Sequence, residues 1–189
     1  MNSTNPHNRH VIHNSRIWAI IGYSFPHKQI PWDEMIEASI ERIYQSARIG
    51  ALCGASSVIF HPAYYLKQSS EEVLERVSGL LGRLASRLED EGINAVLRPE
   101  TTGKPTQFGS LEETLMMASA IEGIMPCIDF SHLHSRSSGE YNTLEEFRDV
   151  LVKVEEYLGR EGLEDMHCHI SGIAYGDKEG EEPPGAPGV

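Results

Sequence analysis

Four side chains of the kinds that bind metal ions stand at the ends of four apolar, strand-like runs. They are His61, Glu100, Asp129 and His169, separated by 39, 29 and 40 residues. These separations are about the length of one strand-helix unit with its loops. Side chains at the carboxyl ends of successive parallel strands converge on one face of a sheet or barrel. The sequence therefore predicts a metal site on that face.

The most specific local motif is Asp-x-x-His, formed by Asp129 and His132 where a strand enters a loop. The motif places a carboxylate and an imidazole on one rim of the expected sheet. The two side chains could bind one ion or two neighbouring ions, and imidazole with carboxylate suits zinc or manganese.

Each candidate alone has a structural alternative. His61 could be a structural histidine that is hydrogen-bonded to the backbone. Glu100 could pair with Arg98, which lies two residues away and on the same side of a regular strand. His167 and His169 share one face of the last strand, so either could reach the site. We favour His169 because it is nearer the carboxyl end.

Strands and helices alternate along the chain that must position these residues. Strands are expected at 57–60, 94–98, 126–130 and 166–170, with a fifth at 16–21. Helix caps are expected at Asp33, at Ser69 or Ser70, at Ser110, and at Thr143 with Glu146 in capping-box position. This alternation predicts a parallel sheet with right-handed crossovers.

Apolar residues at helical spacing predict which helix faces are buried. In the second helix they are Val73, Val77, Leu80, Leu81, Leu84 and Leu88. In the last helix they are Leu144, Phe147, Leu151, Val154 and Leu158.

Length and composition limit the fold and the partners. A complete eight-stranded barrel usually needs about 250 residues, and this chain has 189. We expect one α/β domain at 16–175, an incomplete (β/α) TIM-type barrel with outer helices, between disordered tails at 1–15 and 176–189. The net charge of −12 disfavours broad, nonspecific phosphate binding but leaves a local metal-rich cleft open to nucleic acid.

The remaining composition is typical of a cytoplasmic protein. Cys53, Cys127 and Cys168 are odd in number and lack paired spacing, so we interpret them as buried or reduced thiols. The chain has no run of 18 apolar residues, so no membrane span is expected. Its first residues lack the order of a secretion signal.

Residues 33–177 resemble the endonuclease IV family of apurinic/apyrimidinic endonucleases, within the wider xylose-isomerase-like barrels. The resemblance rests on residues 36–43, 60–65, 99–104, 127–132 and 167–172. Its most specific segments are Glu-Thr-Thr-Gly, from Glu100, and Ile-Asp-x-x-His, which ends at His132.

This resemblance implies a zinc-dependent barrel of DNA base-excision repair that cleaves the DNA backbone beside abasic sites. By the same resemblance, His61 would hold one zinc ion and Glu100, the catalytic carboxylate, would bridge two. Asp129 and His169 would hold the second ion, and His132 would belong to a third. Clustered zinc ions would polarise the phosphodiester and activate water.

The chain also departs from that family. The family has another histidine in an early His-x-Pro-Tyr segment, a pattern that residues 10–30 lack. After His169 the family continues with an acidic-x-His pair and a late glutamate, where this chain has a tail rich in Gly, Pro and Glu. We therefore expect a member truncated at both ends, with weak or no activity alone and with exposed barrel edges that could self-associate.

Two other functions stay open. One is a sugar or sugar-phosphate isomerase or epimerase of the same barrel class, in which a divalent ion and a carboxylate move protons on a small substrate. The other is a non-catalytic barrel piece that acts through association.

Overall fold

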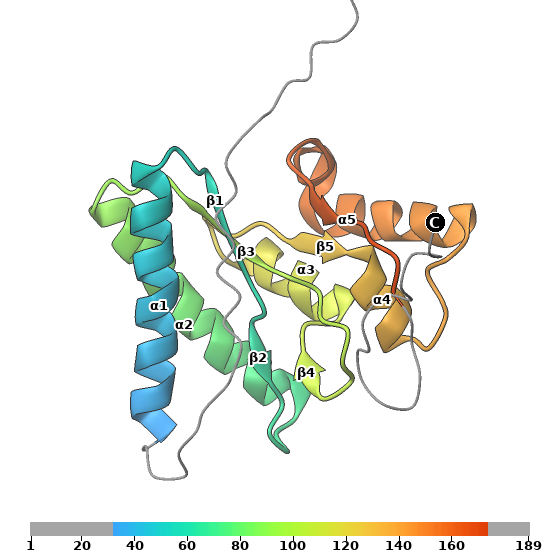
Figure 1. Ribbon diagram of the computed structural model, residues 1–189, viewed down its shortest axis with the longest axis horizontal. Helices are drawn as coiled ribbons and strands as arrows, with labels where there is room; N and C mark the ends of the chain where they lie inside the picture. Colours follow the sequence, from blue (N-terminus) through green and yellow to red (C-terminus); the bar gives the residue numbers. More distant parts are fainter. Residues whose placement is uncertain (1–31, 174–189) are drawn as a thin grey trace, which may run out of the picture.

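The computed structural model describes residues 32–173, in which helices surround a set of parallel strands (Figure 1). The strand predicted at 16–21 and both predicted tails lie outside the described residues. None of the helices in the described part combines the length and the apolar character needed to cross a membrane.

Strands and helices alternate through the described residues. The helices are α1 (Trp32–Leu52), α2 (Ser70–Asp90), α3 (Leu111–Ala120), α4 (Phe130–Arg136) and α5 (Leu144–Glu164). The strands are β1 (Ser57–Phe60), β2 (Ala63–Tyr64), β3 (Val96–Pro99), β4 (Gln107–Phe108), β5 (Cys127–Asp129) and β6 (His167–His169).

Four of these strands run parallel and lie side by side in chain order. β1 pairs with β3, and β5 pairs with β6. Two parallel bridges, Leu97 with Ile124 and Glu100 with Cys127, join β3 to the segment that contains β5. The four strands predicted around 57–60, 94–98, 126–130 and 166–170 are therefore confirmed, and within residues 32–173 they form part of a barrel rather than a closed one.

A short antiparallel pair, β2 with β4, was not predicted from the sequence. It joins the loop that follows β1 to the loop that follows β3, through Ala63 opposite Phe108 and Tyr64 opposite Gln107. Two-residue strands are too short to show a periodic pattern. The pair ties together two loops at the carboxyl end of the sheet.

Capping residues start the helices where the sequence indicates. Ser69, Ser110 and Thr143 each cap a helix, and each forms a full capping box with a glutamate three residues later. Such a box satisfies two otherwise unpaired backbone N–H groups. The predicted cap at Asp33 is wrong, because α1 begins at Trp32 and Asp33 lies in its first turn.

The core has two parts. In the first, α1 and α2 lie side by side against β1 and β3 (Figure 1). The predicted stripe of α2 is buried there, except for Leu80, which is only half-buried. In the second part, α3 and α5 enclose the buried side chains Leu111, Leu115, Ile128, Val150 and Val154.

The buried face predicted for α5 is partly wrong. Val154 is fully buried as predicted, but Leu144, Phe147 and Leu151 are exposed, and Val150, which was not predicted, is fully buried. α5 carries two apolar stripes, and it is the valine stripe that packs against α3 and β5. Gly159, at φ 66° and ψ −169°, then breaks the helical backbone near its end.

Truncations on the two stripes of α5 should therefore have different effects. Val154→Ala should lower the free energy of unfolding by about 1.5–3 kcal/mol, because it removes buried methyl groups and leaves a cavity. Leu144→Ala should change it by at most about 0.5 kcal/mol, since that side chain is exposed. Urea unfolding followed by circular dichroism checks both. Equal losses, or a larger loss for Leu144→Ala, would contradict this packing.

Candidate metal centre

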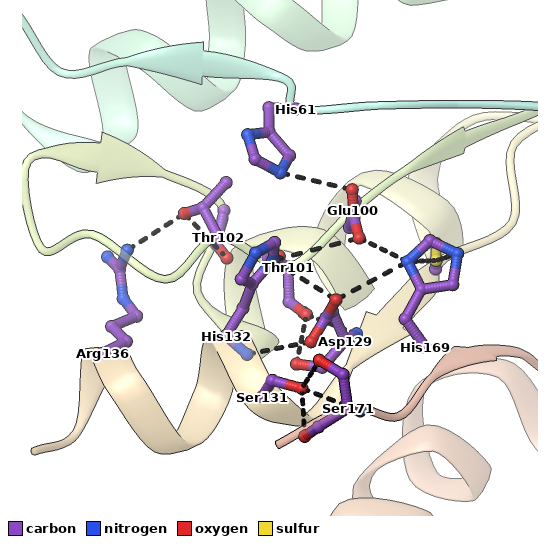
Figure 2. A network of polar contacts seen from close by, with 12 residues as sticks. His61, Glu100, Thr101, Thr102, Asp129, Ser131, His132, Arg136, His169 and Ser171 are labelled. Carbon is purple, nitrogen blue, oxygen red and sulfur yellow. Dashed lines mark hydrogen bonds and ion pairs between the residues drawn. The ribbon is translucent and has the colours of Figure 1, made fainter. Parts of the chain in front are cut away.

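The predicted ligand residues come together at the carboxyl ends of the parallel strands. His61 follows β1, Glu100 follows β3, and Asp129 and His169 end β5 and β6. His132 joins them from the first turn of α4. Figure 2 shows these five side chains pointing toward a common centre from segments far apart in the sequence.

Glu100 lies at the middle of the cluster and uses both of its oxygens. Its Oε2 atom is 3.2 Å from Nε2 of His61. Its Oε1 atom is 2.6 Å from Nδ1 of His169 and 3.9 Å from Nδ1 of His132. One carboxylate thus faces imidazoles on two sides.

Asp129 forms the second acidic position, and the backbone holds it in place. Its Oδ2 atom is 3.6 Å from Nδ1 of His169 and 3.7 Å from Nδ1 of His132. Its Oδ1 atom accepts a hydrogen bond of 2.9 Å from the backbone N–H of His132, because Asp129 is the N-cap of α4. The Asp-x-x-His motif is therefore also a helix start, a capping role that was not predicted from the sequence.

Thr101 positions two members of the cluster, and it was not among the residues predicted from the sequence. Its buried hydroxyl accepts from the backbone N–H of Asp129 at 2.8 Å and donates to the Asp129 carbonyl. Its own carbonyl oxygen lies 2.8 Å from Nδ1 of His132. That contact makes Nδ1 the protonated nitrogen, so the Nε2 atom of His132 keeps the lone pair that a cation needs.

Burial and electrostatics act in opposite directions on Glu100, whose side chain is only 8% exposed. Burial raises the pKa of its carboxyl group. The hydrogen bond from His61, the charges of His61 and His132 and the hydrogen bond from His169 outweigh burial, so the net pKa is lowered. The carboxylate is therefore ionised at neutral pH, as a metal ligand must be.

The donor atoms fall into two overlapping groups that share Glu100. One group is His61, Glu100 and His132, and the other is Glu100, Asp129 and His169. Within each group the donor atoms lie within 4.8 Å of one another. Imidazole nitrogens with carboxylate oxygens are the set that zinc and manganese accept, so the residues present fit a divalent cation.

The structural alternative for Glu100 is wrong, because Arg98 is paired elsewhere. Its guanidinium donates to Oδ2 of Asp165 at 2.6 Å and to the hydroxyl of Ser57 at 3.0 Å. His169 is the histidine of β6 that contacts Glu100, while His167 lies opposite Cys127 in the strand register.

A polar network beside the cluster fixes the loop after β3. Arg136 of α4 donates to the hydroxyl of Thr102 and to the carbonyls of Lys104 and Gln107. It also donates to the hydroxyl of Tyr65, in the loop after β1. No sequence pattern indicates this network, since an arginine in a short helix is ordinary.

The sequence of this chain matches known proteins over most of its length. The model of the xylose isomerase-like TIM barrel family matches residues 8–186. An uncharacterized protein of Methanocaldococcus jannaschii is 47% identical over 149 residues, which are 79% of this chain and 54% of that protein. A probable endonuclease 4 of Clostridium botulinum is 26% identical over 116 residues, 59% of this chain and 40% of that protein. The chain thus spans about half the length of these curated relatives.

Two solved structures share the fold. Endonuclease IV from Thermus thermophilus has a TM-score of 0.50 at 23% identity, over 66% of this chain and 43% of that chain. The 3-keto-D-glucoside 4-epimerase of E. coli has a TM-score of 0.57 at 17% identity, over 82% of this chain and 57% of that chain. With parallel strands, outer helices and a family match across nearly its whole length, the chain belongs to the xylose isomerase-like TIM barrel family.

Proposed function

We propose that this chain provides a two-metal phosphodiesterase centre for DNA with abasic sites, as in base-excision repair, and that it has weak or no activity alone. The observation that supports this most is the use of both Glu100 oxygens, one toward His61 and one toward His169. The likeness to probable endonuclease 4 proteins supports the same substrate class. Zinc as the natural metal and a cytoplasmic location belong to this proposal.

A carboxylate between two groups of donors suits two cations better than one. Its negative charge reduces the repulsion between neighbouring cations. When bound, a pair of divalent cations supplies Lewis acidity to both the attacking and the leaving oxygen of a phosphodiester. Glu100 would bridge such a pair, and the two different histidines that face its two oxygens support this role.

The protein residues prepare the centre before any ligand arrives. The N-terminus of α4 orients Asp129, and the Thr101 carbonyl fixes the tautomer of His132. Hydrogen bonds of this kind orient ligand side chains and raise metal affinity. The chain therefore needs little rearrangement to bind cations at these five residues.

The second candidate is a sugar or sugar-phosphate epimerase. It is supported by the fold shared with the E. coli epimerase and by the net charge of −12, which disfavours a polyanion. In such an enzyme one divalent ion and one carboxylate would suffice. The three histidines around Glu100 and Asp129 favour the phosphodiesterase.

Removing the charge of Glu100 should weaken metal binding. Glu100→Gln should lower zinc affinity at least about tenfold, because both donor groups lose a shared anionic ligand. Calorimetric titration of the metal-free chain measures this, and Glu122→Gln on the exposed surface is the matched control. Unchanged affinity in Glu100→Gln would exclude Glu100 as a ligand.

One assay distinguishes the phosphodiesterase from the epimerase. Chelator-treated chain with zinc restored should nick a duplex that holds one abasic site, slowly, and Glu100→Gln should abolish this nicking. The greater length of the curated relatives is the reason to expect a slow reaction. Metal-dependent epimerisation of a ketose without nicking would favour the second candidate, and nicking that persists in Glu100→Gln would contradict the first.

A glycine beside the cluster offers a more local test. A Cβ added at Gly103 would lie 3.2 Å from Cδ2 of His132 and 3.5 Å from its Cα, so Gly103→Ala should displace that ring. We expect zinc affinity to fall about three- to tenfold with the fold retained. Gly172→Ala is the control, since nothing lies within 4 Å of its added Cβ. Equal zinc affinity of the two variants would show that His132 does not bind the metal.

A further inference from the structure

A second group of donor atoms lies one step deeper in the sheet than the carboxylate cluster. In the pairing of β5 with β6, Cys127 is opposite His167, and Asp129 is opposite His169. Residues two apart on a strand share a face. Cys127 and His167 therefore form a layer directly beneath Asp129 and His169, on the same side of the sheet.

The distances in this layer are those of a metal site. Donor atoms of Cys127, His167 and His169 all lie within 4.8 Å of one another. The sulfur of Cys127 is 3.7 Å from Nε2 of His169 and 3.8 Å from Nδ1 of the same ring. In a tetrahedral zinc site, with bonds of about 2.3 Å to sulfur and about 2.0 Å to nitrogen, a sulfur and a nitrogen ligand lie about 3.5 Å apart. The separation from Nε2 is close to this distance between ligand atoms. Because the sulfur is almost equidistant from the two nitrogens, the His169 ring would turn to aim Nε2 at a cation shared with Cys127.

We propose that Cys127, His167 and His169 form a sulfur-containing site for a four-coordinate divalent cation such as zinc, distinct from the carboxylate cluster and sharing only His169 with it. Nδ1 of His169 lies against Glu100, so the cation in this deeper site would use Nε2 of the same ring. Water or a substrate atom would fill the fourth position. The proposal does not depend on the phosphodiesterase function.

The donor atoms of this deeper site favour a soft cation over a hard one. Cys127 is fully buried, and Nε2 of His167 is shielded from solvent. A cation binds cysteine as the thiolate, so the Cys127 thiol would lose its proton on binding. Thiolate and imidazole prefer zinc to magnesium or manganese, which favour oxygen ligands.

The shared imidazole would couple the two sites. The His169 ring would use Nδ1 for the carboxylate cluster and Nε2 for the deeper site, and only its imidazolate form, with neither nitrogen protonated, can bind cations through both nitrogens at once. Occupation of the deeper site would therefore fix the His169 ring and its charge state for the carboxylate cluster.

Cobalt(II) provides a direct probe, because thiolate ligation gives a charge-transfer band in the near ultraviolet. The wild-type chain titrated with cobalt should show this band, and Cys127→Ser should lose it. Cys168→Ser is the matched control, since Cys168 points to the other side of β6, and it should keep the band. His61→Gln should also keep it, because His61 belongs to the carboxylate cluster and not to this group, which separates the site from the proposed function.

X-ray absorption on the wild-type chain loaded with zinc tests the same site without a variant that could misfold. A sulfur scatterer at about 2.3 Å from zinc is expected. Bound cobalt without a thiolate band, a band that survives Cys127→Ser in a folded variant, or zinc with only nitrogen and oxygen neighbours would each overturn the proposal.

Discussion

The central constraint on this molecule is the buried charge of Glu100. An ionised carboxylate removed from water is costly unless its partners compensate for it. Here His61 and His169 lie against its two oxygens, and the interactions with His61, His132 and His169 outweigh burial and lower the pKa of the group. The imidazoles of His61 and His169 stabilise the Glu100 carboxylate from two sides. The same arrangement would suit two cations bridged by that carboxylate. The histidines that compensate the buried charge are therefore the same residues that would bind the cations.

A β-bridge, a pair of hydrogen bonds and a helix cap hold the side chains of this cluster in place. The bridge between Glu100 and Cys127 sets the register of β3 against β5. The Thr101 hydroxyl accepts from the backbone N–H of Asp129 and donates to its carbonyl. Asp129 in turn caps α4, which presents His132. Asp129 and His132 are thus oriented by Thr101, which follows directly after the bridge between Glu100 and Cys127. Small shifts in one strand end would propagate to several donors.

Much of this could be predicted from the sequence, because strand ends and helix caps are local signals. The four parallel strands, the helix caps at Ser69, Ser110 and Thr143, and the grouping of candidate ligands at one face follow from patterns of a few residues. The buried face of α5 could be predicted only in part: Val154 was in the predicted stripe, but the helix has two apolar stripes and packing against α3 buries Val150 in place of Leu151. Thr101 and the deeper layer at Cys127 were also missed, because their importance depends on pairing between strands distant in sequence.

Anomalous X-ray diffraction at the zinc edge, from crystals of the metal-loaded chain, would test the bridging role of Glu100 most directly. We expect two peaks about 3.5–4 Å apart on either side of the Glu100 carboxylate, one toward His61 and one toward His169. Loaded crystals in which Glu100 contacts no peak, or in which a single ion binds only one of its oxygens, would contradict that role.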